Sequence, residues 1–168
     1  MKYTSWDRTD RDAPVLLAEA GPQELGRFTD ETAAVNGSTW ALAHHEDTGA
    51  HASLADGRVF RADGDLRKDK TITVDLAGRV FNFVNESSNN WIIDDADGTK
   101  IGQFSGGDNG VRTAVLEFED GVALPVEEVA ALSWFARLIL EARLTKGSTA
   151  LIATLILMSV VAILAFLF

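Results

Sequence analysis

Cysteine is absent from this chain of 168 residues, and its absence excludes several classes of structure. Without thiols the protein forms no disulfide, offers no thiolate nucleophile and lacks the ligands of zinc fingers and cysteine-held iron–sulfur clusters. Histidine is also scarce, with three residues in the whole chain. The missing disulfides are consistent with a reducing compartment.

The N-terminus lacks the apolar segment of a secretory signal. Residues 1–8 are polar, and the first apolar run, Ala13–Ala18, is short and contains Pro14. A signal peptide needs an uninterrupted apolar region of about 7 to 15 residues. We therefore expect that the N-terminal part is not exported.

Positive charge is in deficit before the last part of the chain. Residues 1–145 carry 14 basic against 25 acidic side chains, a net charge of −11. Binding to phosphates needs a basic surface, so this charge balance argues against nucleic acid as a partner. Broad attraction to anionic lipid headgroups is disfavoured for the same reason.

The C-terminal run has no charged side chain. Within Ala150–Phe168 only Thr154 and Ser159 are polar, and with the preceding threonine the run has 20 residues. As a helix rising ~1.5 Å per residue it measures ~30 Å, the thickness of a bilayer core. We therefore expect residues 146–168 to form a single C-terminal transmembrane helix, a tail anchor. In it, Ala150 and Thr154 form a small-xxx-small pair that favours close packing against a partner helix.

Basic residues lie only on the N-terminal side of this run. Arg137, Arg143 and Lys146 precede it, and no residue follows it in this sequence. The positive-inside tendency then predicts a protein of the cell membrane, single-pass, with its N-terminal domain in the cytoplasm. These three residues, together with Trp134, are expected at the membrane interface.

The first 37 residues show no regular pattern. They are polar and are interrupted by Pro14, Gly21, Pro22 and Gly26. Such punctuation is typical of irregular chain, so residues 1–37 are predicted to be a polar N-terminal arm.

Residues 38–124 have the pattern of an antiparallel β domain. Short β-type runs alternate there with four Asp-Gly pairs, which begin at Asp56, Asp63, Asp97 and Asp120. Asp-Gly accepts the positive φ angles of tight turns between neighbouring strands. Three hairpins are expected, pairing Thr71–Leu76 with Val80–Val84, Trp91–Ile93 with Ile101–Phe104, and Thr113–Phe118 with Val122–Leu124. The fold class is therefore mainly β, a meander of about eight strands that forms a barrel or a sandwich.

A long apolar helix is predicted over residues 125–145. The segment follows Pro125, contains no glycine, and has Glu127 and Glu128 in its first turn, where the helix dipole favours acids. Its apolar side chains surround nearly the whole helix, so it must be enclosed. It is expected either to pack in the β domain or to lie in the membrane interface, with residues 145–148 as a hinge to the anchor.

A sheet of short antiparallel strands followed by one apolar helix resembles the tubby-like fold of the LURP-one and phospholipid scramblase relatives. The resemblance rests on the strand-turn-strand segment Asn90–Gly102 and on the helix from Val126, and it covers residues 38–144. It implies a closed barrel around a central hydrophobic helix, and association with lipid or with a partner protein. It transfers no catalytic residue.

The only three histidines of the chain lie close together in the sequence. His44, His45 and His51 flank Glu46 and Asp47, and imidazole and carboxylate groups bind transition metals. Successive side chains of a strand point to opposite faces, however, so His44 and His45 do not easily chelate one ion. We regard them as weak candidates and expect a solvated turn, with no metal and no other cofactor.

No catalytic constellation is recognised in the sequence. We expect a non-enzymatic accessory or adaptor subunit of a larger membrane protein complex, with the bilayer and integral membrane proteins as partners and no small-molecule substrate. A lipid-binding or scramblase-like protein at the cytoplasmic face is the alternative.

Overall fold

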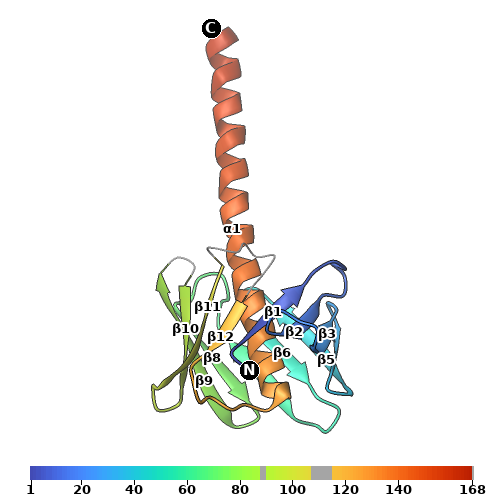
Figure 1. Cartoon of the computed structure of the whole chain (residues 1–168). Coiled ribbons are helices and arrows are strands. Elements are labelled where there is room, and N and C mark those ends of the chain that lie inside the picture. The colour runs from blue at the N-terminus through green and yellow to red at the C-terminus, as the bar shows by residue number, and fades with distance from the viewer. Residues whose placement is uncertain (88–89, 107–114, 168) are drawn as a thin grey trace.

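The computed structural model describes residues 1–87, 90–106 and 115–167. Within these residues twelve strands form a closed antiparallel barrel, and helix α1 runs through it and projects from one end (Figure 1). Every strand pairs with its neighbour along the chain, and β1 pairs with β12 to close the barrel. The topology is thus a simple meander whose closure joins the two ends of the β region.

The strands are short, and α1 is the long element. The strands are β1 (Tyr3–Asp7), β2 (Val15–Ala18), β3 (Glu24–Phe28), β4 (Thr32–Val35), β5 (Ser38–His45), β6 (Gly49–Ser53), β7 (Val59–Asp63), β8 (Thr71–Leu76), β9 (Arg79–Ser87), β10 (Asn90–Asp95), β11 (Lys100–Ser105) and β12 (Val115–Phe118). Helix α1 extends from Val126 to Leu167. Beyond Leu144 its described side chains are those of Thr154, Leu155, Ile156, Met158 and Ser159.

The core lies between the inner face of the barrel and the first part of α1. Alternate residues of each strand point inward, as β8 illustrates with Ile72 and Val74 fully buried and Thr73 exposed between them. From α1, Leu132 and Ile139 are fully buried against these strands. Burial of each such side chain stabilises the fold by about 1.5–3 kcal/mol. A helix with apolar side chains on all sides is stable here because the barrel surrounds it.

The antiparallel β character predicted from the sequence is confirmed. Thr71–Leu76 pairs with β9, and Trp91 and Phe104 face each other in the β10–β11 hairpin. The glycine of the turn at Asp97 has a φ of 78°, and the Asp95 carboxylate accepts hydrogen bonds from the backbone N–H groups of Asp97 and Thr99 at 3.0 and 2.9 Å. Such bonds and the positive φ are what the Asp-Gly pattern predicts.

The expected hairpin across Asp120 is wrong. Residues 122–124 form no strand, because the chain after β12 crosses the end of the barrel to begin α1. Gly121 does adopt a positive φ of 87°, so the turn itself exists. The first two residues of the predicted run Thr113–Phe118 lie outside the described residues.

The N-terminal segment expected as a polar arm contains β1 to β4. Each is only four or five residues long, and prolines and glycines fall between or beside them. Because β1 pairs with both β2 and β12, these residues complete the barrel. The count of about eight strands was therefore too low, and the sandwich alternative is excluded by closure of the sheet.

The predicted C-terminal transmembrane helix, residues 146–168, is corrected by the structure. In the part of the chain that the structure describes, no helix is both long enough and apolar enough to cross a membrane. Residues 149–167 are the distal part of α1 rather than a separate element, and residues 145–148 continue the helix instead of forming a hinge. The tail-anchor assignment is therefore withdrawn.

Candidate functional site at the helix exit

Because neighbouring strands run in opposite directions, the connections between them lie alternately at one end of the barrel and at the other. In an antiparallel meander, successive connections fall at opposite ends. The β1–β2, β3–β4, β5–β6, β7–β8 and β9–β10 connections thus share one end, which is the end where α1 leaves the barrel (Figure 1). We call this end the exit and the opposite end the entry.

At the entry, two ion pairs join the first turn of α1 to the barrel. Arg58 lies 3.0 Å from Glu127, and Arg79 lies 2.9 Å from Glu128. The two glutamates also lie at the helix N-terminus, where the dipole favours negative charge. The start of the helix is therefore fixed to the β6–β7 connection, which contains Arg58, and to β9, which begins at Arg79.

Inside the barrel, α1 contacts the strands through aromatic packing and one buried hydrogen bond. Trp134 stacks on Phe28 with 6.5 Å between ring centroids. The hydroxyls of Ser133 and Thr4 lie 2.8 Å apart, and both residues are buried. Because the Ser133 hydroxyl donates to the Val129 carbonyl at 2.8 Å, its one proton is used there, so the Thr4 hydroxyl is the donor between the two side chains.

Near the exit, a chain of charged side chains fixes α1 to the start of the chain. Glu141 lies 2.9 Å from Arg137 on the same helix and 3.4 Å from Arg8, which follows β1. The Arg137 guanidinium also lies 5.0 Å from the ring centroid of Trp6. The cation–π contact joins α1 to β1, and the ion pair of Glu141 with Arg8 joins α1 to the residue that follows β1.

Arg143 occupies the point at which α1 passes the rim. Its guanidinium lies 4.5 Å from the ring centroid of Trp91 and donates a hydrogen bond of 2.5 Å to the carbonyl of Asp69 in the β7–β8 connection. Burial lowers the pKa of Arg143, and the nearby carboxylates of Asp65 and Asp69 oppose that shift. These two contacts attach α1 to β10 and to the β7–β8 connection, and so they fix the direction in which the helix leaves the barrel.

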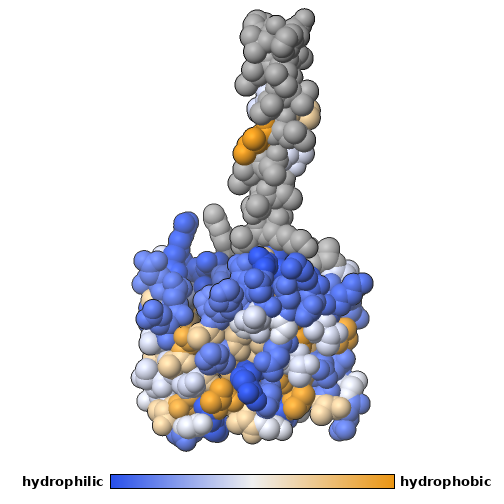
Figure 2. All heavy atoms as spheres, turned by 180° about the vertical axis from the view of Figure 1, so that it is seen from behind, coloured by the Kyte–Doolittle hydropathy of each residue, from blue (hydrophilic) through white to orange (hydrophobic). Residues whose placement is uncertain are grey.

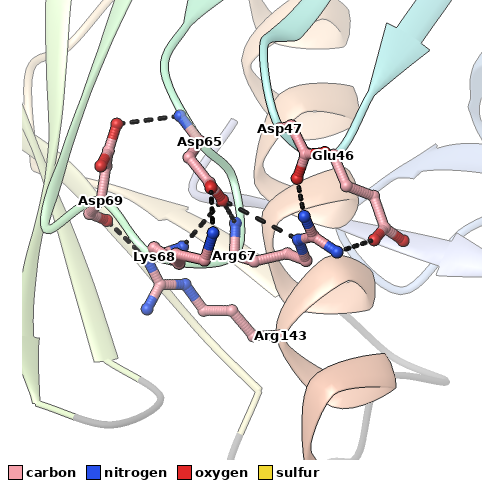
Figure 3. Close-up of polar contacts among 7 residues, drawn as sticks. All are labelled: Glu46, Asp47, Asp65, Arg67, Lys68, Asp69 and Arg143. Carbon is pink, nitrogen blue, oxygen red and sulfur yellow. Dashed lines mark hydrogen bonds and ion pairs between the residues drawn. The ribbon is translucent and has the colours of Figure 1, made fainter. Parts of the chain in front are cut away.

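Seven residues form a polar cluster beside this point, drawn in Figure 3: Glu46, Asp47, Asp65, Arg67, Lys68, Asp69 and Arg143. We call it the exit collar. Arg67 contacts Asp47, lies 3.5 Å from Glu46 and 3.9 Å from Asp65, and so links the β5–β6 turn to the β7–β8 connection. Partial burial acts to raise the pKa of Asp65, but hydrogen bonds from Lys68 and from backbone N–H groups lower it overall. The collar is thus an interlocked ion-pair network.

Beyond the exit, α1 exposes large apolar side chains. Leu155, Ile156 and Met158 are 59%, 60% and 64% exposed. On the face seen in Figure 2, hydrophilic side chains gather at the barrel end from which the helix leaves, and an apolar side chain stands out on the helix beyond it. A helix that is fixed over its first part and apolar in its projecting part can dock on another molecule without reorganising.

Three of the four residues predicted at the membrane interface, Trp134, Arg137 and Arg143, contact the barrel instead. Trp134 is a core residue, 3% exposed, and Arg137 and Arg143 make the contacts described above. Thr154 is exposed on the projecting helix. The side chains of Lys146 and Ala150 lie outside the described residues.

The histidines lie at the β5–β6 hairpin and are exposed. His45 pairs with Gly49 and His51 with Ala43, so His45 and His51 share the outer face and line a shallow depression of about 240 Å³. His44 is also exposed and also lines this depression, although strand alternation places it on the opposite face of β5 from His45. Among the residues that the structure describes, no three acidic or histidine side chains are arranged to hold a metal ion.

Sequence reasoning missed Arg8, Asp69 and Trp91, which contact α1 at the exit. Nothing in their local sequence marks them. Because successive connections of an antiparallel meander alternate between the two ends, the β1–β2 and β7–β8 connections could have been placed at the same end. That inference requires all twelve strands to be assigned first.

Comparisons with known proteins give no relative: no family model, no curated protein and no solved structure matches the chain. The function is therefore inferred from the geometry of the exit.

Proposed function

We propose that this protein is a non-enzymatic accessory subunit that docks on a larger protein complex through the projecting part of α1. The observation that carries the proposal is the exposure of Leu155, Ile156 and Met158 on a helix that the barrel holds in place. Each of these side chains would gain about 1.5–3 kcal/mol on transfer from water into an apolar contact. Such side chains at one projecting site favour a docking role.

The barrel supports this role as a rigid mount. α1 is tied to it at the entry through Glu127 and Glu128, in the core through Ser133, and at the exit through Glu141 and Arg143. A helix fixed in this way loses little conformational freedom on binding, which favours affinity. Small closed barrels can hold ligands inside, but here the first part of α1 fills the interior.

The test compares three forms of the full-length protein purified from its own cells in a mild detergent. The first is the unaltered chain, and the second carries Leu155→Gln, Ile156→Gln and Met158→Gln, which we call the glutamine variant. The third is a control, Val59→Gln, because Val59 is an exposed apolar residue on the barrel surface at 38% exposure. Stoichiometry is measured by mass spectrometry of the intact assemblies.

We expect one stoichiometric protein partner with the unaltered chain and the Val59 variant, and its loss from the glutamine variant. A protein that purifies alone, or with lipid as its sole companion, would contradict the proposal. The second result would favour the alternative of a lipid-binding or scramblase-like protein. A partner that is retained by the glutamine variant would place the docking surface elsewhere.

A further inference from the structure

The loops that surround the projecting helix carry unneutralised negative charge. Outside the exit collar, the exit connections and the adjoining end of β9 hold five exposed carboxylates that form no ion pair with any described residue: Asp10, Asp12, Asp30, Glu31 and, on β9, Glu86. Exposed basic side chains without such a pair in the same connections are Arg11 and Lys70. The exit rim around α1 is therefore net negative.

The collar itself does not offset this charge. Its basic residues Arg67 and Lys68 are engaged by Glu46, Asp47 and Asp65, so they neutralise carboxylates of the collar. Arg143 is directed at Trp91 and a backbone carbonyl. Figure 2 shows hydrophilic side chains gathered at this end of the barrel on the face that is seen.

Any molecule that covers the projecting helix near the barrel also faces this rim. Like charges placed opposite each other across an interface cost affinity, and complementary charges raise the association rate. We infer that the partner presents an apolar groove framed by lysine and arginine side chains, so that its basic frame faces the acidic exit rim. The inference rests on the proposed docking function and adds the chemistry of the partner.

The same charge argues against an anionic membrane surface as the occupant. Anionic headgroups attract basic segments and would face the acidic rim as like charge. A protein groove with a basic frame satisfies both features, the apolar helix and the negative rim.

Two peptides serve as probes of stated chemistry. One is an amphipathic helix of leucine and lysine of about 18 residues, ~27 Å long at ~1.5 Å per residue, and the other is its leucine–glutamate counterpart. Each carries a dye, and its binding to the full-length protein is measured by fluorescence anisotropy at low and high ionic strength. Vesicles of phosphatidylcholine and of phosphatidylserine are tested in parallel by flotation.

Charge-reversal variants at the two ends of the barrel provide the matched comparison. The exit variant is Asp30→Lys with Glu31→Lys, and the entry variant is Asp97→Lys with Asp120→Lys, which changes the net charge equally. All four side chains are exposed and form no ion pair with the described residues. Circular dichroism confirms that both variants fold before binding is compared.

We expect the leucine–lysine peptide to bind in a salt-dependent manner and the leucine–glutamate peptide to bind at least about tenfold more weakly. The exit variant should lose about tenfold in affinity at low salt and the entry variant less than about twofold. The glutamine variant should lose binding altogether.

Two results would overturn the inference in different ways. If the glutamine variant abolishes binding but the exit and entry variants behave alike, the basic frame is wrong while the docking helix stands. If the glutamine variant binds as the unaltered chain does, or if the protein floats with either vesicle and binds neither peptide, the proposed docking function fails as well.

Discussion

Removal of the buried hydroxyls of Thr4 and Ser133 tests whether α1 lies inside the barrel. Both side chains are at most 1% exposed, and their oxygens lie 2.8 Å apart on β1 and α1, 129 positions apart in sequence. Thr4→Val, Ser133→Ala and the double variant form a double-mutant cycle. No hydrogen bond between these residues is possible unless the helix passes through the barrel next to β1.

The direction of the hydrogen bond makes the two single changes unequal. Ser133→Ala leaves the buried Thr4 hydroxyl without its acceptor, which costs about 1–3 kcal/mol, and the gain in helix propensity of alanine over serine returns about 0.5 kcal/mol. Thr4→Val leaves Ser133 donating to Val129 and costs about 1 kcal/mol. The double variant leaves neither hydroxyl behind and should cost less than about 1 kcal/mol.

The free energy of unfolding of the full-length protein is measured by urea titration followed by tryptophan fluorescence. We expect the double variant to be more stable than the sum of the single changes implies, by about 1–2 kcal/mol. Equal m-values among the variants serve as the control that the unfolded state is unchanged. Additivity within about 0.5 kcal/mol would refute the contact and with it the threaded position of α1.

Further predictions concern a glycine, the exit contacts and acid stability. Gly49→Ala should lower the free energy of unfolding by more than about 3 kcal/mol, because the φ of Gly49 is 106° and an added Cβ would lie 2.0 Å from a backbone oxygen. Gly57→Ala, with open space around it, should cost about 1 kcal/mol in the same urea titration. Arg143→Ala should increase the mobility of a spin label at a cysteine replacing Thr154, read from its electron paramagnetic resonance spectrum, and an unchanged spectrum would contradict a fixed helix. Hydrogen bonds from the backbone and the side chain of Arg58 lower the pKa of Asp56 from its ordinary value of 3.8. The ionised carboxylate therefore stabilises the folded state above that ordinary value, and this stabilisation is lost as the pH falls through the lowered pKa. Asp56→Asn should therefore weaken the acid dependence of stability below about pH 4, and a curve parallel to that of the unaltered chain would contradict this.

The hairpins in the middle of the chain could be predicted from the sequence because the residues that determine each of them lie within a few positions of one another. Asp-Gly turns require positive φ, and strands such as Thr71–Leu76 alternate between buried and exposed residues over six positions. The strands β1 to β4 have no such length, and each becomes stable only beside its neighbours. The pairing of β1 with β12 joins residues more than a hundred positions apart, and no periodicity reports it.

The exit could not be predicted from the sequence for the same reason. Arg137 and Arg143 were interpreted as the charges that flank a membrane span. The sequence shows only that these basic residues lie close to an apolar run, and that pattern is typical of the end of a span. In the barrel they contact Trp6 and Trp91. Their partners lie on β1, on β10 and in the β7–β8 connection. These contacts could be predicted only from the complete fold, which the sequence patterns assigned in part.

A photo-crosslinking amino acid at the position of Ile156, in the full-length protein in its own cells, tests the central claim most directly. Ile156 is 60% exposed on the projecting helix. The account predicts a crosslink to one protein partner, absent when the same amino acid is placed at Val59 on the barrel surface. Crosslinks to lipid alone, or equal protein crosslinks from both positions, would contradict it.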